Sequence, residues 1–344
     1  MPTPLTSADR HPQCRSPGAP VGSRGEGMRR IRPTLNSQLP YTRLMDALWA
    51  YYNGEWIPTR ELRIGVDDLG FLLGATVTER LRTFRGQVFR LEEHMRRLRR
   101  SLEIVGLDLE VISNQVAAAI CEFVSRNREQ IAEDDDWSIV AFCTPGVAGA
   151  ARPTVCVHGY ALPFQLWADQ FESGIRVVVS DVRQIPPESL SPELKCRSRM
   201  HFYLADRRAA QRQPGARAVL LDEDGYVAEA STANVLVYRD GEGLVSPPPE
   251  HILFGVSVHV VQELASELGL PFITRPLAVE QLRSADEAML TSTSVCLLPI
   301  VECDGKPIGD GRPGPVYNQL LKAWSDMVGL DVAAQARWFA NRSS

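Results

Sequence analysis

Residues 227–234 read Val-Ala-Glu-Ala-Ser-Thr-Ala-Asn, and this stretch is the most informative in the chain. It places one carboxylate, Glu229, just before small hydroxyl side chains at the expected end of a strand. A buried carboxylate keeps a neighbouring heteroaromatic nitrogen protonated, whereas hydroxyl and backbone N–H groups suit an anion. The stretch alone fits a polar turn equally well, so its function depends on the rest of the sequence.

Three other segments carry groups that can bind an anion. The run Thr-Ser-Thr-Ser at 291–294 ends another expected strand, and Gly255-Val256-Ser257 opens an expected helix. A helix N-terminus binds phosphate through its free N–H groups and its dipole. Arg97 lies on an amphipathic helix, and its guanidinium can bind a phosphate through two hydrogen bonds. The alternative for Arg97 is an exposed side chain in an arginine-rich stretch.

Lys195 is the candidate for chemistry that needs a primary amine. Lysine occurs only at positions 195, 306 and 322, and the other 34 of the 37 basic residues are arginines. Lys195 follows an extended segment and precedes an expected helix. A partly desolvated lysine has a lowered pKa and can form a Schiff base with a carbonyl group. The alternative is a surface lysine whose apolar stem packs against the protein.

Composition and charge restrict the class of protein. The chain has 344 residues, 44% of them apolar and 23% charged, which is enough for two globular domains. A net charge of −5 argues against nucleic-acid binding. Seven scattered cysteines without a C-x-x-C pair suit a reduced cytoplasm and no structural zinc. No apolar stretch approaches the roughly 20 residues of a membrane helix, and residues 1–43 lack the apolar segment of a secretory signal. We therefore expect a cytoplasmic protein with small-molecule ligands and no metal, nucleic-acid or membrane partner.

Local patterns predict alternating strands and helices. Asn53-Gly54 between two strand-like runs predicts a two-residue hairpin turn. Apolar residues at steps of three and four predict a helix from Leu91 to Val105 that stops at Gly106. Further expected helices cover 109–130, 200–211 and 256–268, and further strands cover 137–143, 154–160, 174–179, 216–221, 226–229, 234–238, 272–274 and 288–291.

This mixture of helices and hairpins predicts an α+β fold with two domains. We expect a small N-terminal α/β domain at 48–160, a connection at 161–172, and a larger β-rich domain with helices at 173–335. Residues 1–43 are expected to be a disordered arm or a misassigned start, because they are rich in Arg, Pro, Ser and Gly and show no apolar periodicity.

The order of these segments resembles the class IV aminotransferases, the fold-type IV pyridoxal-phosphate enzymes. That family includes branched-chain aminotransferases, D-amino acid aminotransferases and aminodeoxychorismate lyases. The resemblance runs from about Tyr51 to Pro315. It is carried by His94-Met95-Arg96-Arg97-Leu98, Leu194-Lys195, the stretch 227–234, Ile252-Leu253-Phe254-Gly255-Val256-Ser257, and the stretch 285–293, in this order.

The resemblance implies a role for each matching residue. Lys195 resembles the Schiff-base lysine, which also moves the proton during catalysis, and Glu229 resembles the carboxylate that pairs with the pyridine nitrogen. Arg97 matches the phosphate-binding arginine of H-x-x-R-L. The other implied cofactor-binding residues are Leu253, packed behind the ring, and the phosphate-side residues Val256, Ser257, Ser292 and Thr293. Asn234 is expected to fix the turn after Ser231 and Thr232.

The substrate side departs from the family pattern. The segment 74–82 lines up with the F-E-G-x-R or Y-E-x-x-K region of the family, but Thr78 stands where an aromatic residue is usual. The R-x-H pair of D-amino acid aminotransferases is absent, because Arg152-Pro153-Thr154 lacks the histidine. Arg82 is a candidate ligand for a substrate carboxylate, with an exposed arginine at a strand end as the alternative. Candidate substrate-binding residues are therefore Arg82, Thr78 and Arg152.

The resemblance implies a homodimeric, pyridoxal 5′-phosphate-dependent aminotransferase. It would move an amino group between an amino acid, first of all a branched-chain L-amino acid, and a 2-oxo acid such as 2-oxoglutarate. An aminodeoxychorismate lyase that releases pyruvate, a D-amino acid aminotransferase, and a cofactor-binding protein without turnover remain as alternatives.

Overall fold

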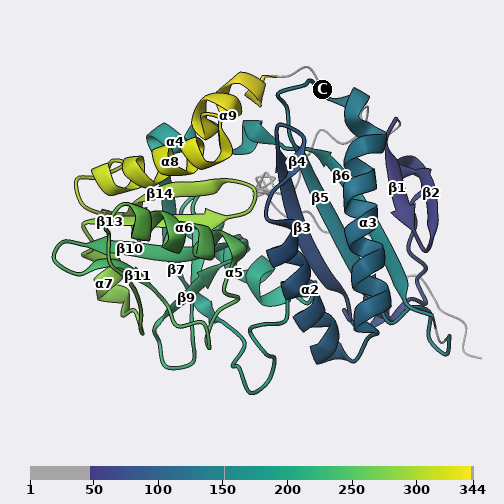
Figure 1. The fold of residues 1–344 in the computed structure, drawn as a ribbon. Helices are drawn as coiled ribbons and strands as arrows, with labels where there is room; N and C mark the ends of the chain where they lie inside the picture. Colours follow the sequence, from purple (N-terminus) through teal and green to yellow (C-terminus); the bar gives the residue numbers. More distant parts are fainter. Residues whose placement is uncertain (1–46, 151, 342–344) are drawn as a thin grey trace, which may run out of the picture. The chain divides into compact units, whose positions relative to one another are not determined.

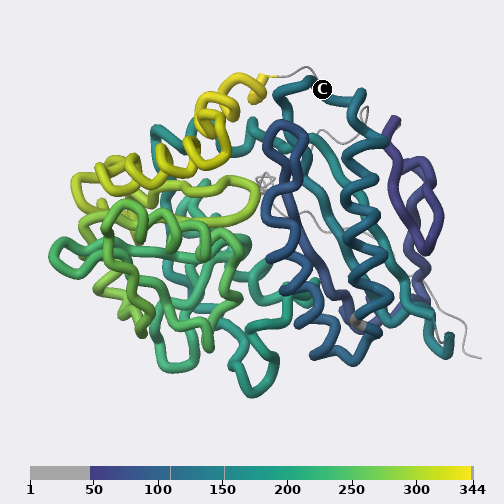
Figure 2. Tube along the Cα trace, viewed as in Figure 1, coloured from purple at the N-terminus to yellow at the C-terminus, as the bar shows by residue number. Residues whose placement is uncertain are grey.

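The computed structural model describes residues 47–150 and 152–341, and the predicted arm at 1–43 lies outside them. Two β-sheets, each accompanied by helices, account for most of these residues (Figure 1). The Cα trace runs from a hairpin in purple to the last helices in yellow (Figure 2). None of the helices in the described part of the chain is both long and apolar enough to cross a membrane.

The first sheet is antiparallel and has the strand order β2-β1-β6-β5-β3-β4. It begins with the predicted hairpin, in which Asn53 and Gly54 have positive φ angles, as the two-residue turn requires. The strands are β1 (Trp49–Tyr52), β2 (Glu55–Pro58), β3 (Val77–Phe84), β4 (Gln87–Val88), β5 (Trp137–Thr144) and β6 (Thr154–Ala161), and the short helix α1 (Leu69–Leu72) precedes β3.

Helices α2 (Leu91–Val105) and α3 (Leu109–Asn127) cover one face of this sheet (Figure 1). α2 ends at Gly106 in the left-handed conformation, as predicted. Its apolar stripe, with Leu98 and Leu102 fully buried, packs into a core that also holds Phe123 and Trp137. The opposite edge of α2 carries Arg97 toward a pocket.

The second sheet is mixed and contains a closed ring of strands. β9 pairs with both β8 and β10, so the order β10-β13-β14-β7-β8-β9 returns to its start. The strands are β7 (Ile175–Arg183), β8 (Arg217–Leu221), β9 (Val227–Ala230), β10 (Ala233–Arg239), β11 (Gly243–Ser246), β12 (Phe272–Thr274), β13 (Glu287–Ser292), β14 (Cys296–Cys303) and β15 (Lys306–Pro307).

Helices in this half connect the strands and follow the last of them. They are α4 (Gln170–Ser173), α5 (Met200–Arg212), α6 (Val256–Glu267), α7 (Val279–Arg283), α8 (Pro315–Val328) and α9 (Val332–Ala340). The predicted connection at 161–172 contains a 3₁₀ turn at Phe164–Leu166 and the start of α4. The domain boundaries themselves stay a prediction.

Candidate active site

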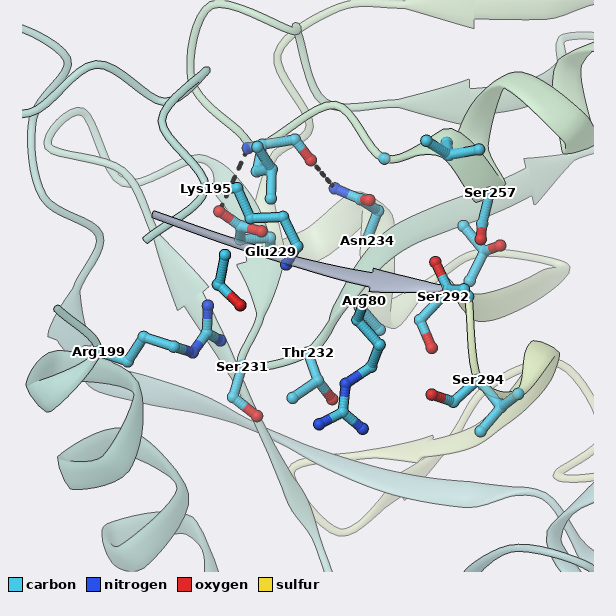
Figure 3. A pocket seen from close by; sticks show the side chains of 18 of the residues that line it. Arg80, Lys195, Arg199, Glu229, Ser231, Thr232, Asn234, Ser257, Ser292 and Ser294 are labelled. Atoms are coloured by element: carbon cyan, nitrogen blue, oxygen red, sulfur yellow. Dashed lines mark hydrogen bonds between the residues drawn. The ribbon is translucent and has the colours of Figure 1, made fainter. Parts of the chain in front are cut away.

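A pocket of about 280 Å³ brings together residues that are far apart in the sequence. Its lining comes from β3, α2, the end of β6, the segment before α5, the β9–β10 turn, the start of α6 and the β13–β14 turn (Figure 3). All the predicted cofactor-binding residues line it: Arg97, Lys195, Glu229, Leu253, Val256, Ser257, Ser292 and Thr293. The roles proposed for them therefore concern a single site.

Lys195 lies in the segment between β7 and α5 and is fixed there by its backbone. Its N–H donates to Ser101 Oγ at 3.1 Å, and its carbonyl accepts from the N–H of Thr78 at 2.9 Å. Burial, helped by the nearby guanidinium of Arg97, lowers the pKa of Lys195 to about 7. The amine is therefore largely neutral, and nucleophilic, just above neutral pH.

Glu229, on β9, is buried and has two fixed neighbours. Its Oε1 accepts from Gln184 Nε2 at 2.5 Å and from the N–H of Leu253 at 3.4 Å. Gln184 Oε1 in turn lies 2.9 Å from His201 Nε2. Burial raises the pKa of Glu229 to about 7, against the lowering effect of the Leu253 N–H. A cation beside this carboxylate, such as a protonated ring nitrogen, would favour its ionised form.

The start of α6 is held against the pocket by Asn234. Asn234 Nδ2 donates to the Leu253 carbonyl at 2.9 Å, so this residue fixes the 252–257 segment rather than the turn after Ser231 and Thr232 that we expected. A Cβ atom on Gly255 would lie 2.5 Å from Asn234 Oδ1, which explains the glycine. No side chain caps α6, so its first N–H groups are left without a side-chain acceptor. Val256 and Ser257, the first residues of this helix, line the pocket.

Arg97 is oriented by Glu79, a residue that the sequence did not single out. Arg97 Nε and Nη2 donate to the two carboxylate oxygens of Glu79, each at 2.8 Å, and His94 Nδ1 lies 2.9 Å from Glu79 Oε2. Burial alone would raise the pKa of Glu79, but Arg97 and His94 hold it well below its usual range. Arg97 Nη1 has no hydrogen-bond partner among the described residues and remains available to an anion.

The three candidate substrate residues have different positions. Thr78 lines the pocket, although its hydroxyl donates to the Ala141 carbonyl at 2.9 Å. Arg152 is exposed outside the pocket, where its Nη2 donates to the Asn53 carbonyl at 2.9 Å. Arg82 does not line the pocket, and it is not the exposed arginine of the alternative interpretation either, because it is buried.

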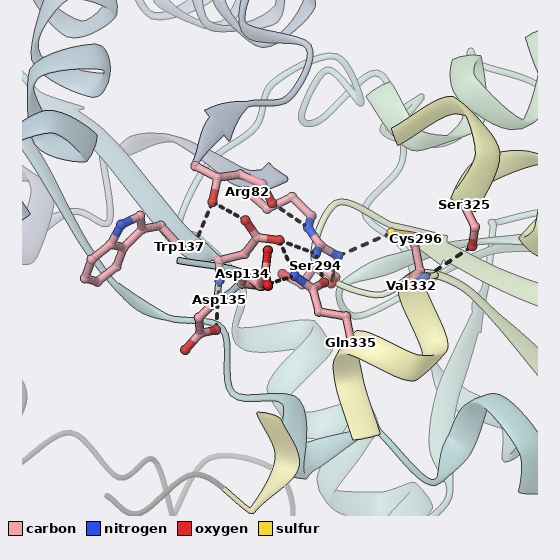
Figure 4. A network of polar contacts seen from close by, with 11 residues as sticks. Arg82, Asp134, Asp135, Trp137, Ser294, Cys296, Ser325, Val332 and Gln335 are labelled. Carbon is pink, nitrogen blue, oxygen red and sulfur yellow. Dashed lines mark hydrogen bonds and ion pairs between the residues drawn. The ribbon is translucent and has the colours of Figure 1, made fainter. Parts of the chain in front are cut away.

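Arg82 is instead the centre of a buried polar network (Figure 4). The residue is only 1% exposed, and its Nη2 lies 3.3 Å from Asp136 Oδ2 and 3.2 Å from Gln335 Oε1. Its Nη1 donates to the carbonyl of Ser294, a pocket residue, at 3.1 Å. Because Asp136 already compensates its charge, Arg82 has a structural role in place of the expected substrate contact.

Several other pocket residues were not predicted as site residues. Pro163, Leu166 and Trp167 form an apolar part of the lining, and Arg80 and Arg199 add positive charge. The sequence shows a run of arginines after Lys195, but it does not show which of these arginines face the pocket. The segment is neither helix nor strand, so it has no periodicity from which their direction could be predicted.

Comparison with known proteins identifies the family. A family model described as Amino-transferase class IV matches residues 76–303. A Methanocaldococcus jannaschii protein, named as a putative branched-chain-amino-acid aminotransferase, is 28% identical over 284 residues, covering 80% of this chain and 95% of that protein. The D-alanine aminotransferase of Staphylococcus aureus is 27% identical over 285 residues, covering 81% and 97%.

A solved structure agrees with these relatives. The branched-chain aminotransferase of the thermophilic archaeon Thermoproteus uzoniensis, solved with norvaline, has a TM-score of 0.72 to this chain at 25% identity. The match covers 85% of this chain and 98% of that one. The family model spans more than half of the chain and includes the residues from Thr78 to Val295 that line the pocket. This chain therefore belongs to the class IV aminotransferases and has their two-domain α+β fold.

Proposed function

We propose that this protein is a pyridoxal 5′-phosphate-dependent aminotransferase that moves an amino group between an amino acid and a 2-oxo acid. One observation carries the proposal. A single pocket combines a lysine of lowered pKa, a buried carboxylate and a set of anion-binding groups from segments far apart in the sequence. The family of the chain supports the same reaction class.

The residues present fit this cofactor. Arg97, the first N–H groups of α6, and the hydroxyls of Ser257, Ser292 and Thr293 are donors that suit a phosphate. Lys195 supplies the primary amine that can form a Schiff base with the cofactor aldehyde. Glu229 supplies the carboxylate that can pair with a protonated pyridine nitrogen. Leu253 is an apolar residue of the same lining and would pack against the ring.

When bound, the cofactor supplies a ring that accepts the electrons left at the substrate Cα after its proton is removed. Lys195 Nζ is the base that takes this proton, since its lowered pKa leaves a large fraction of the amine neutral at pH 7. Glu229 would stabilise a proton on the ring nitrogen, and Gln184 holds the Glu229 carboxylate in place. The Glu79–Arg97 pair fixes the guanidinium that would bind the phosphate.

A branched-chain L-amino acid is the donor that we propose. The relatives named as branched-chain aminotransferases support this choice, and Pro163, Leu166 and Trp167 offer an apolar surface for an aliphatic side chain. The missing R-x-H pair weighs against a D-amino acid donor. The lyase remains the second candidate because it uses the same cofactor residues.

The test is product analysis with the cofactor-loaded protein. Incubation with L-leucine and 2-oxoglutarate should give 4-methyl-2-oxopentanoate and glutamate in equal amounts. Pyruvate release from aminodeoxychorismate without any amino acceptor would assign the lyase instead. Absence of any product from L-leucine, D-alanine and aminodeoxychorismate would contradict both enzymatic assignments and leave a cofactor-binding protein without turnover.

Replacement of Glu229 by glutamine tests the proposed role of the carboxylate. Glutamine has nearly the same shape and can still accept from the Leu253 N–H, but it cannot carry the negative charge. We expect turnover to fall by about 100-fold while the cofactor stays bound. Glu223→Gln, an exposed carboxylate at the turn before β9, is the matched control. Turnover of the Glu229 variant at the wild-type rate would remove the role.

We also propose that the protein is a homodimer. Val66, Phe71 and Leu73 are more than two thirds exposed in and around α1, and an apolar surface of this kind suits burial against a second copy. Gly74 accepts a hydrogen bond from Ser198 Oγ at 2.9 Å, which links this surface to the segment that carries Lys195. The cytoplasmic location stays a prediction, and the six described cysteines are all free.

A further inference from the structure

Two buried carboxylates at the pocket have partners of different charge. Glu79 is paired with the guanidinium of Arg97 at 2.8 Å. Glu229 forms no ion pair with a Lys or Arg in the described part of the chain, and its hydrogen bonds come from neutral groups, the Gln184 amide and the Leu253 N–H. The protein therefore compensates the charge of Glu79, whereas the charge of Glu229 is left for a cation that enters the pocket.

The orientation of the Gln184 amide follows from its neighbours. An ionised carboxylate only accepts hydrogen bonds, so the NH₂ group of Gln184 faces Glu229 Oε1, at 2.5 Å. Gln184 Oε1 faces the other way and accepts from the N–H of Ile185 at 3.3 Å. The same oxygen lies 2.9 Å from His201 Nε2, so this ring nitrogen carries the proton. The hydrogen bonds therefore run in one direction, from His201 through Gln184 to Glu229.

His201 and Gln184 lie behind Glu229 rather than in the pocket. Gln184 directly follows β7, His201 is the second residue of α5, and both side chains are half-buried. The His201 ring packs against Phe202, with 4.1 Å between the ring centroids, which restricts the direction of Nε2. Neither His201 nor Gln184 lines the pocket. A change at either residue therefore reaches a molecule in the pocket through Glu229.

We infer that Gln184 and His201 are positioning residues that orient the Glu229 carboxylate toward a protonated ring nitrogen without compensating its charge. The inference rests on the proposed function, because it requires a pyridine ring in the pocket. Hydrogen bonds to charged groups are the stronger ones, so loss of Gln184 should weaken the pairing of Glu229 with the ring by roughly 10-fold. His201 acts one bond further away, and Ile185 also holds Gln184 Oε1, so loss of His201 should have a smaller effect.

Titration of the full-length protein, stripped of cofactor, with two ligands tests this role by binding rather than turnover. One ligand is pyridoxal 5′-phosphate, and the other is its 1-deaza analogue, in which a C–H group replaces the ring nitrogen and cannot be protonated. At pH 8 the Glu229 carboxyl, with a pKa of about 7, is largely ionised. Gln184→Leu should raise the dissociation constant of pyridoxal 5′-phosphate about 10-fold, and His201→Leu about 3-fold. Both variants should change that of the analogue by less than about 2-fold.

Three further variants separate positioning from a general loss of structure. Gln213→Leu removes another half-buried glutamine that donates to a carboxylate, that of Glu302 outside the pocket, and should leave both dissociation constants unchanged. His201→Gln can place an amide N–H where Nε2 lies and should keep the wild-type affinity for pyridoxal 5′-phosphate. In a Glu229→Gln background, Gln184→Leu should have no further effect, because the carboxylate on which it acts is absent.

Two results would overturn the inference. One is a Gln184→Leu variant that changes neither dissociation constant or raises both equally, and the other is an effect of Gln184→Leu that persists in the Glu229→Gln background. A His201→Leu variant with wild-type affinity for both ligands would overturn the role of His201. All of these require a wild-type protein that binds pyridoxal 5′-phosphate, so they leave the proposed function intact. A wild-type protein that does not bind this cofactor contradicts the proposed function and removes the inference with it.

Discussion

Replacement of Lys195 by alanine should abolish amino-group transfer. Lys195 is the one lysine in the pocket lining, and its neutral amine is proposed both to bind the cofactor and to move the substrate proton. Loss of both functions should lower turnover by about 10⁴-fold or more. The fold should persist, because the main-chain contacts of residue 195 to Ser101 and Thr78 do not involve its side chain.

The other two lysines provide matched controls. Lys306 and Lys322 are exposed and lie outside the pocket, so their alanine variants should turn over at the wild-type rate. Reduction of the loaded protein with borohydride followed by peptide mass analysis should place the cofactor on Lys195 alone. Full activity of Lys195→Ala, or attachment at Lys306 or Lys322, would rule out the assignment.

Replacement of Arg82 by leucine should have the largest effect on stability. Asp136 is fully buried, and without Arg82 its charge would remain in the interior uncompensated. Removal of one partner from such a buried pair lowers the free energy of unfolding by about 3–5 kcal/mol. The variant should also loosen the β13–β14 turn, because Ser294 loses the hydrogen bond from Arg82.

Urea denaturation of three variants checks this expectation. Arg152→Leu, which removes an exposed arginine with one hydrogen bond, should change the free energy of unfolding by no more than about 0.5 kcal/mol. Arg82→Leu/Asp136→Asn should recover part of the loss, since asparagine removes the unpaired charge and can still accept from Thr83. A loss below about 1 kcal/mol for Arg82→Leu would contradict the network's structural importance.

Much of the fold was accessible from local sequence patterns. The Asn53-Gly54 turn, the helix from Leu91 to Val105 and the strands β5 and β6 lie where these patterns placed them, whereas β3 and β4 were not predicted. Strand β14 was missed because Pro299 lies in its middle, and proline normally argues against a central strand. The helices α8 and α9, which follow it, were not predicted either.

The candidate site was also only partly predictable. Residues from Arg97 to Thr293 were grouped by a resemblance of motifs, and the structure brings them to one pocket. Strand β3 misled the prediction, because Arg82 was expected to contact the substrate and Glu79 was not singled out, whereas both are buried in separate ion pairs. Their partners Arg97 and Asp136 lie 18 and 54 residues away, so no local pattern reports these contacts. The same strand directs Arg80 into the pocket.

The most direct test of the account is the visible absorption spectrum of the purified protein, loaded with pyridoxal 5′-phosphate, before and after addition of L-leucine without an acceptor. The account predicts a yellow protein that bleaches on addition of the amino acid and recovers its colour when 2-oxoglutarate is added. A yellow absorption band that does not change on addition of L-leucine would contradict the proposed donor. A protein that acquires no yellow band would contradict the central claim that Lys195 and its neighbours form a pyridoxal-phosphate site.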